Sequence, residues 1–201
     1  MPILPAPTRE RTRQRILAGA VEAVARHGLA KLDMGDVSES AGVSRGTLYR
    51  YFASRETLLS ELTVHEALRF WKGCLDALAE ADEAARVQVL FLQATRRVHE
   101  HAALRRILET DPALVLRAVR EQFPRIRGQL ETLLAPQLAA APWVRDGVTG
   151  TTGLADWVAR LMVSAFLVPA DDPEALARGL DALLDPGAPR ETPGEAGSGP
   201  R

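Results

Sequence analysis

The densest group of side chains able to recognise another molecule lies in GVSRGTLYRYF, residues 42–52. Placed on a helix at about 100° per residue, Leu48 and Phe52 point to one side, whereas Thr47 and Arg50 point to the opposite side. Arginine can bind guanine through two hydrogen bonds, threonine can contact thymine, and tyrosine hydroxyls can reach phosphates. The stretch therefore predicts a helix whose polar side lies in the major groove of DNA.

The neighbouring sequence predicts the elements that would position this helix. Ser44 is a typical N-cap, and Gly42 is a typical end for the preceding short helix, which Asp33 caps. An amphipathic helix over about 8–27 comes before both. Two short helices joined by a tight glycine-containing turn form a helix-turn-helix unit.

The expected DNA contacts extend slightly beyond the predicted recognition helix. Free N–H groups at its start would face an anion, and Arg55 would add charge toward phosphates. Residues 1–55 carry nine basic against five acidic side chains, although the whole chain has a formal net charge of -1. The expected DNA-contacting set is Ser44, Arg45, Gly46, Thr47, Tyr49, Arg50, Tyr51 and Arg55.

The stretch from Arg11 to Leu62 resembles the tetracycline-repressor (TetR) family of bacterial transcription regulators. The resemblance rests on RQRILAGAVEAVARHG and on MGDVSESAGVSRGTLYRYFASRETLL. It implies a homodimer that binds a double-stranded DNA operator and releases it when a small molecule enters the C-terminal domain. The later helices match the family more loosely.

The resemblance also implies roles for individual residues. Arg45, Gly46 and Thr47 occupy base-contacting and groove-approaching positions. Tyr49 and Tyr51 occupy groove-lining and phosphate-contacting positions.

Four positions depart from the family pattern, among them Ser38, where alanine is common, and Ala53, where proline is frequent. Arg55 stands where a phosphate-binding lysine is usual. Gly35 replaces a more usual polar residue in the second helix, which lowers helix propensity by about 1 kcal/mol.

The rest of the chain predicts an all-α fold of about nine or ten helices, because no segment alternates with period two. A long helix from Ser54 carries an apolar stripe, composed of Leu58, Leu62, His65, Leu68, Trp71, Leu75 and Leu78. Further helices are expected near 83–101, 102–109, 112–120, 122–139, 151–168 and 173–184. The predicted organisation is an N-terminal arm over 1–8, a DNA-binding domain over 9–54, a ligand-binding and dimerisation domain over 55–185, and a disordered tail over 186–201.

The helix over 151–168 is apolar on most sides, which indicates burial on several sides. With the last helix it could form a four-helix dimer interface, the usual arrangement in the family; burial within a monomer core is the alternative. The residues expected in the interface are Trp157, Val158, Leu161, Met162, Phe166, Leu176, Leu180 and Leu183.

The evidence for a ligand pocket is weaker in the sequence. Candidate lining residues, on helices that enclose the pocket in relatives, are Trp71, Leu75, Phe91, Leu116 and Arg160. An aromatic stripe at helical spacing is also typical of plain core, and Arg160 could pair with Asp156 one turn away. Few polar groups fall inside these stripes, so we expect a mostly apolar effector.

No catalytic residue, metal site or cofactor is predicted, and the chain is not expected to be an enzyme. His99 and His101 are two apart, about 200° around a helix, so surface histidines are expected there. Cys74 is expected to be a buried, inert thiol.

The single cysteine, the absence of about 18 uninterrupted apolar residues and the lack of a signal-peptide pattern predict a cytoplasmic protein outside the membrane. The leading hypothesis is a ligand-responsive repressor. The alternatives are a ligand-free or protein-gated DNA-binding protein, and a helical enzyme with an appended helix-turn-helix.

Overall fold

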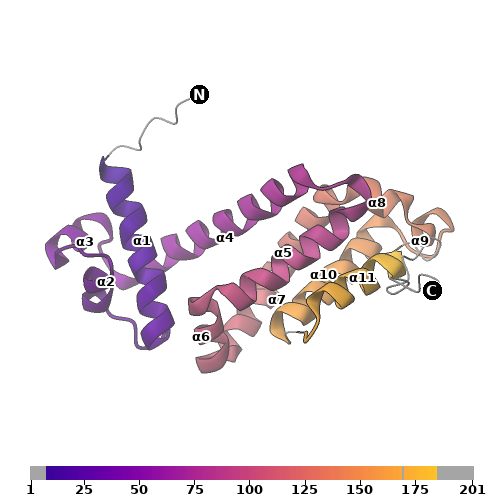
Figure 1. Cartoon of the computed structure of the whole chain (residues 1–201). Coiled ribbons are helices and arrows are strands. Elements are labelled where there is room, and N and C mark those ends of the chain that lie inside the picture. The colour runs from indigo at the N-terminus through magenta and orange to yellow at the C-terminus, as the bar shows by residue number, and fades with distance from the viewer. Residues whose placement is uncertain (1–7, 169, 185–201) are drawn as a thin grey trace, which may run out of the picture.

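The computed structural model describes residues 8–168 and 170–184, with only the backbone described at 98, 99 and 183. Over these residues the chain forms eleven α-helices and one 3-10 helix, with no strand (Figure 1). Most of the expected N-terminal arm and the whole expected tail lie outside the described residues. The α-helices are α1 (Thr8–His27), α2 (Met34–Ser40), α3 (Arg45–Tyr51), α4 (Arg55–Glu80), α5 (Arg86–Glu100), α6 (Ala102–Thr110), α7 (Pro112–Leu133), α8 (Ala135–Ala140), α9 (Pro142–Arg145), α10 (Thr151–Leu167) and α11 (Pro173–Leu184).

The first three helices, here called the N-terminal unit, share an apolar core. Ile16, Leu17, Leu48 and Phe52 have no exposed surface in this core. Gly42 has a φ of 60°, a left-handed conformation that ends α2 and turns the chain into α3. Because burying each such side chain contributes about 1.5 to 3 kcal/mol, the core fixes how α3 is rotated.

Side-chain caps set the starts of three helices in this part of the chain. A carboxylate oxygen of Asp33 accepts a hydrogen bond from the backbone N–H of Asp36 at 3.0 Å. The hydroxyl of Ser44 accepts one from the N–H of Thr47 at 3.1 Å, and Ser54 caps α4 in the same way. The three caps satisfy N–H groups that a helix start leaves without partners.

Helix α4 links the N-terminal unit to the C-terminal helices (Figure 1). Leu58 and Leu62 at its start are buried in the first core, and Cys74 and Leu78 at its end are buried in a second core. One continuous helix therefore belongs to both cores. A shift of α4 relative to one core would move the α4 side chains that pack in the other core.

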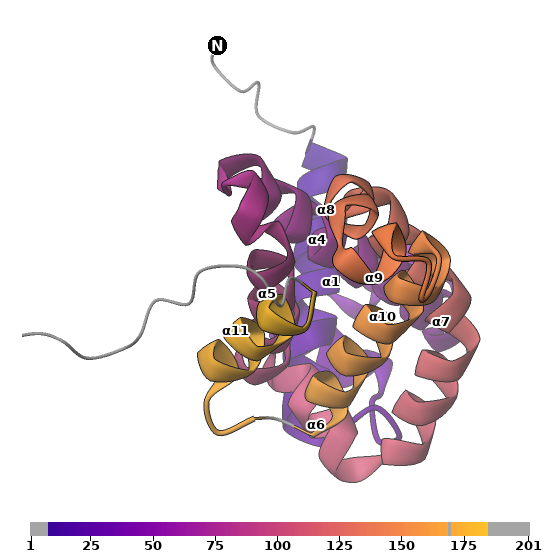
Figure 2. The same cartoon turned by 90° about the vertical axis from the view of Figure 1, so that its right-hand side faces the viewer.

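The C-terminal helices form a bundle around the second core (Figure 2). Helix α10 packs against both α5 and α7, and α11 packs against α5. Phe91, Leu130 and Leu154 are among its almost fully buried side chains. This bundle supplies the framework on which α4 and α6 meet the N-terminal unit.

The helix boundaries differ from expectation around two prolines. Separate helices over 112–120 and 122–139 were expected, but α7 runs without a break from Pro112 to Leu133 and includes Pro124. A proline φ suits a helix, and Val115 and Leu130 on either side of it are buried, so packing outweighs a helix penalty of about 3 kcal/mol. The short helix that begins at Pro142 was not predicted.

The continuous buried stripe expected along α4 is wrong in its middle. Leu68 is 66% exposed and Leu75 is 53% exposed. Helix α4 packs mainly against α1 near its start and against α5 further along. Its covered side therefore follows two different neighbours, and part of the apolar stripe stays at the surface.

Candidate functional site

Helix α3 lies at the end of the molecule remote from the C-terminal bundle (Figure 1), and most of its polar side chains are exposed. Leu48 is fully buried, whereas Thr47 and Tyr51 are half-buried. The exposed predicted residues of this region are Ser44, Arg45, Gly46, Tyr49 and Arg50. A continuous surface of hydroxyl, phenol and guanidinium groups results, with a glycine that permits close approach.

Contacts among these side chains hold part of the surface in place. The Ser44 hydroxyl donates to the Thr47 hydroxyl at 3.0 Å while capping α3. The guanidinium carbon of Arg50 lies 6.0 Å from the centre of the Tyr51 ring, at the outer limit of a cation–π contact. The first contact joins the N-cap to the first turn of α3, and the second joins two neighbouring side chains in its last turn.

The unusual Gly35 makes room for Arg45. A Cβ atom at position 35 would lie 2.5 Å from Arg45 Nη2 and 2.8 Å from Asp33 Oδ1. The guanidinium group therefore lies over α2 beside the capping carboxylate. Hydrogen bonds from the backbone N–H groups of Asp36 and Gly35 lower the pKa of Asp33, and the charge of Arg45 lowers it further.

Arg55 is placed differently from the other arginines. Its Nε donates to the backbone carbonyl of Leu32 at 2.9 Å, and its Nη2 donates to the carbonyl of Leu29 at 2.6 Å. Arg55 thus ties the start of α4 to the loop between α1 and α2, a structural role that the sequence did not indicate. Its expected phosphate contact stays a prediction.

A cavity of about 510 Å³ lies between the N-terminal unit and the C-terminal helices. Its wall combines α1 and the loop after it with α4, α6, α7, one residue of α5, the α5–α6 junction and one residue of α10. Representative apolar lining residues are Val24, Leu62, Phe70, Ile107, Val115 and Phe166. The volume is typical of sites for small organic ligands.

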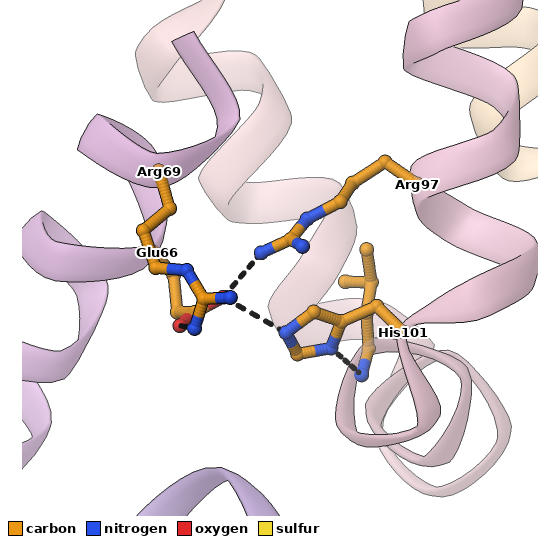
Figure 3. Close-up of polar contacts among 5 residues, drawn as sticks. Glu66, Arg69, Arg97 and His101 are labelled. Atoms are coloured by element: carbon orange, nitrogen blue, oxygen red, sulfur yellow. Dashed lines mark hydrogen bonds and ion pairs between the residues drawn. The ribbon is translucent and has the colours of Figure 1, made fainter. Parts of the chain in front are cut away.

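Three polar residues that line the cavity, Glu66, Arg97 and His101, contact one another, as Figure 3 shows. Glu66 Oε2 of α4 accepts a hydrogen bond from Arg97 Nη2 at 2.5 Å and lies 2.8 Å from His101 Nε2. Its other oxygen, Oε1, has no hydrogen bond and lies 3.6 Å from Arg69 Nη1. We call Glu66, Arg69, Arg97 and His101 the polar cluster.

The geometry fixes the neutral tautomer of His101. Its Nδ1 accepts a hydrogen bond from the backbone N–H of Leu104 at 3.2 Å, capping α6. The ring proton of the neutral imidazole therefore sits on Nε2, which donates to Glu66. Burial raises the pKa of Glu66, but the hydrogen bond from His101 and the charges around it, including that of Arg97, outweigh burial and leave the pKa lowered.

None of the residues expected to bind a ligand lines this cavity. Phe91 is buried in the second core, Trp71 packs against that core, and Leu75 and Leu116 are about half exposed. Arg160 bonds to Asp156 at 2.6 Å and stacks over an aromatic ring on α7. The residues expected on α4, Trp71 and Leu75, lie in its second half, whereas the α4 residues that line the cavity lie between Leu59 and Phe70.

The polar cluster was missed because its members are far apart in the sequence. His101 was expected at the surface, but its side chain is only 14% exposed. Glu66 and His101 are 35 residues apart, and only the packing of α4 against α5 brings them together.

The residues expected in a dimer interface fall into three groups. Trp157, Leu161 and Leu176 are 48%, 41% and 42% exposed. The second group, which is buried within this subunit, comprises Val158, Met162 and Leu180. Phe166 lines the cavity, and the side chain of Leu183 lies outside the described residues. The buried group fills the core because α10 packs against α5 and α7, and α11 packs against α5.

Cys74 is buried as expected, and burial raises the pKa of its thiol to about 11. The thiolate is therefore scarce at neutral pH. Within residues 8–168 and 170–184, no three His, Cys, Asp or Glu side chains are grouped so as to hold a metal ion. In the same part of the chain, no helix combines the length and apolar character needed to cross a membrane.

Comparison with known sequences points to one group of proteins. Residues 16–62 match the family model described as bacterial regulatory proteins, tetR family. An uncharacterised HTH-type transcriptional regulator of Mycobacterium tuberculosis strain H37Rv is 29% identical over 164 residues, which cover 79% of this chain and 76% of the relative. The HTH-type transcriptional repressor LfrR of Mycolicibacterium smegmatis is 42% identical over 64 residues, or 32% of this chain and 33% of the relative.

Comparison with solved structures extends the similarity to the fold of both parts. The regulator FadR from Bacillus subtilis, solved in complex with stearoyl-CoA, aligns with a TM-score of 0.61 at 17% identity. The alignment covers 87% of this chain and 98% of that chain. The arrangement of the N-terminal unit and the C-terminal bundle is therefore shared with a ligand-bound transcriptional regulator.

Proposed function

Because this chain belongs to the tetR family of bacterial regulatory proteins and is a DNA-binding transcriptional regulator, we propose that it represses transcription by placing α3 in the major groove of an operator. The observation that carries this proposal is the exposed polar side of α3 above the fully buried Leu48 and Phe52. In this arrangement Arg45 and Thr47 contact base edges, and Tyr49 and Tyr51 contact phosphates. We place this activity in the cytoplasm, where bacterial DNA lies.

Fluorescence anisotropy with duplexes from the DNA upstream of the protein's own coding sequence tests this proposal. We expect one segment to bind about 1,000-fold or more tightly than scrambled DNA of equal length. The affinity should fall steeply as salt rises, because phosphate contacts release counterions. Equal affinity for operator candidates and scrambled DNA would contradict the proposed role of α3.

We propose that the regulator acts as a homodimer through α10 and α11, which lie side by side in Figures 1 and 2. The support is the exposure of Trp157, Leu161 and Leu176, three large apolar side chains on these two helices. Two copies would present their recognition helices about 34 Å apart, one turn of DNA. A palindromic operator follows from this symmetry.

Sedimentation velocity of Trp157→Glu tests the interface. A charge in the centre of an apolar contact should convert the dimer to a monomer and weaken operator binding. Leu68→Glu is the control, since Leu68 is an apolar residue on α4 that is even more exposed than Trp157, at 66% against 48%. Monomers from Leu68→Glu and dimers from Trp157→Glu would locate the interface elsewhere.

We propose that the cavity between the two parts binds a small, mostly apolar effector that releases DNA. Its wall includes α1 of the N-terminal unit as well as α4, α6 and α7, so a ligand inside contacts both parts. A ligand that binds better when α4 and α1 are arranged for weak DNA binding shifts the population to that state. The cavity favours such a ligand over regulation by a protein partner alone.

Two adjacent positions provide a matched test. Val115 lines the cavity and is buried, whereas Leu116 is 50% exposed and does not line it. Val115→Trp should fill the cavity and abolish release of DNA by an active compound, while operator binding persists. Leu116→Trp should respond to the compound as the native protein does; an equal response from Val115→Trp would exclude the cavity as the effector site.

A further inference from the structure

The polar cluster carries an excess of positive charge. Glu66 supplies one negative charge, whereas Arg97 and Arg69 supply two positive charges and His101 supplies a hydrogen-bond donor. Glu66, Arg97 and His101 line the cavity directly. The remaining polar lining residues, Thr63 and Gln122, are uncharged. A ligand that reaches the polar cluster meets donors and positive charge in excess of acceptors.

Glu66 has a second charged neighbour, Arg69, in addition to Arg97. Its Oε2 serves Arg97 and His101, while its Oε1 makes no hydrogen bond and lies 3.6 Å from Arg69 Nη1. If another carboxylate took Arg97 and His101, Glu66 would remain paired with Arg69. Two carboxylates would then face two guanidinium groups and one imidazole, so no charge would be left unpaired in the cavity.

From this charge balance we infer that the effector is an amphiphile with a single anionic head, such as a carboxylate, and an apolar body. This inference rests on the proposed effector role of the cavity. The head binds Arg97 and His101 in exchange for Glu66, and the body fills the space among Val24, Ile107 and Phe166. A cationic head would instead add to the one excess positive charge, and a neutral head would leave that excess charge uncompensated.

The exchange also bears on the helices around the cavity. Glu66 is on α4, Arg97 is on α5, and His101 caps α6, which packs against α1. Replacing Glu66 by a ligand removes the direct bond between α4 and the α5–α6 junction. The head group that determines which ligand binds therefore also changes a contact between α4 and the α5–α6 junction, and α6 packs against α1 of the N-terminal unit.

Three compounds with one chain and different heads test the inference: decanoate, 1-decanol and decylammonium. Binding to the native dimer is measured by calorimetry at pH 7.5. We expect decanoate to bind about tenfold or more tightly than decanol, because only the carboxylate brings a charge opposite to that of the Arg97 guanidinium and can accept two hydrogen bonds from it. Decylammonium should bind most weakly. Equal affinities, or tightest binding of decylammonium, would overturn the anionic head.

Variants of the polar cluster give opposite expected shifts. Arg97→Gln should reduce decanoate affinity to that of decanol and leave decanol within about twofold, which also reports an intact cavity. Glu66→Gln should tighten decanoate several-fold, because the competing carboxylate is gone. Arg105→Gln, at an exposed position on α6, should change neither.

The outcomes separate the two proposals. Binding of all three compounds with no effect of Arg97→Gln would overturn the head-group assignment and support the cavity as a binding site. Failure of all three compounds to bind would overturn the effector role of the cavity together with the inference. Neither result would alter operator binding by the ligand-free protein, which tests the role of α3 separately.

Discussion

Two arginines beside carboxylates occupy contrasting environments in this molecule. Arg45 lies near Asp33 on the surface of the N-terminal unit, where water screens the attraction. Arg97 shares an oxygen of Glu66 with His101 in the wall of the cavity, and its side chain is only 28% exposed. Water can replace the partner of Arg45 at little cost in free energy, whereas the groups around Glu66 require another charged partner. The surface arrangement thus suits exchange for a DNA base, and the cavity arrangement suits exchange for a ligand anion.

The largest expected effect comes from removing the shared carboxylate. Glu66→Ala leaves Arg97 without its closest partner and His101 without its acceptor, so the free energy of unfolding should fall by about 3 kcal/mol at pH 7. Urea denaturation followed by circular dichroism measures the change. Glu109→Ala is the control, because the Glu109 side chain is 66% exposed and makes only a long contact with Arg106. Equal, small losses of stability from both variants would show that Glu66 contributes no more than an exposed surface carboxylate.

The same variant predicts a pH dependence. The pKa of Glu66 is lowered in the folded protein, so its contribution is fully present above the ordinary pKa of a glutamate in the unfolded chain. It is lost as the pH falls through the lower folded value. The stability difference between native protein and Glu66→Ala should therefore be constant from pH 6 to 7.5 and shrink in acid. A difference that grows in acid would contradict the lowered pKa.

Arg55 sharpens the comparison because it is partly buried and binds backbone carbonyls instead of a carboxylate. Arg55→Ala removes two charge-assisted hydrogen bonds and should lower the free energy of unfolding by about 2 kcal/mol. Thermal unfolding measures this, with the exposed Arg50→Ala as the control. Unchanged stability with equally weakened binding to operator and scrambled DNA would instead assign Arg55 to phosphates.

The two regions also differ in how far the sequence predicts them. Ser44, Leu48 and Phe52 act through contacts within one turn or two, so their spacing alone predicts α3 and its polar side. Glu66 acts through partners 31 and 35 residues away, and no local pattern indicates which residues packing will bring together. Leu75 shows the same limit in reverse: its spacing predicts burial, but no neighbouring helix covers it in this subunit.

Arg45 itself should affect recognition without affecting stability. Arg45→Ala removes the guanidinium proposed to read a base, so discrimination at one operator base pair should fall about tenfold, or roughly 1.4 kcal/mol. Anisotropy with single-base operator variants measures this, and the melting temperature should not move. A uniform loss across all duplexes would show that Arg45 contacts phosphate.

A smaller effect is expected from the partner of Arg45. Asp33→Asn keeps the cap, because asparagine accepts the same backbone hydrogen bonds, but removes the negative charge beside the guanidinium. Scrambled DNA should bind a few-fold more tightly, and the preference for the operator should fall by about the same factor. No change in either affinity would show that the charge of Asp33 has no part in recognition.

Gly35→Ala tests the position of the guanidinium without changing any charge. The new Cβ would fall 2.5 Å from Arg45 Nη2 and 2.8 Å from Asp33 Oδ1, so the Arg45 side chain must move off α2 and the capping carboxylate must shift. Alanine favours a helix by up to about 1 kcal/mol over glycine, which offsets a weakened cap, so stability should change little while operator preference falls about twofold. Gly128→Ala in α7 is the control, since nothing lies within 4 Å of its Cβ and it should leave DNA binding unchanged. If Gly35→Ala keeps the full operator preference, Arg45 selects its base without support from α2. The Arg45 guanidinium would then need no fixed position on the protein surface, whereas the Arg97 guanidinium is held by Glu66.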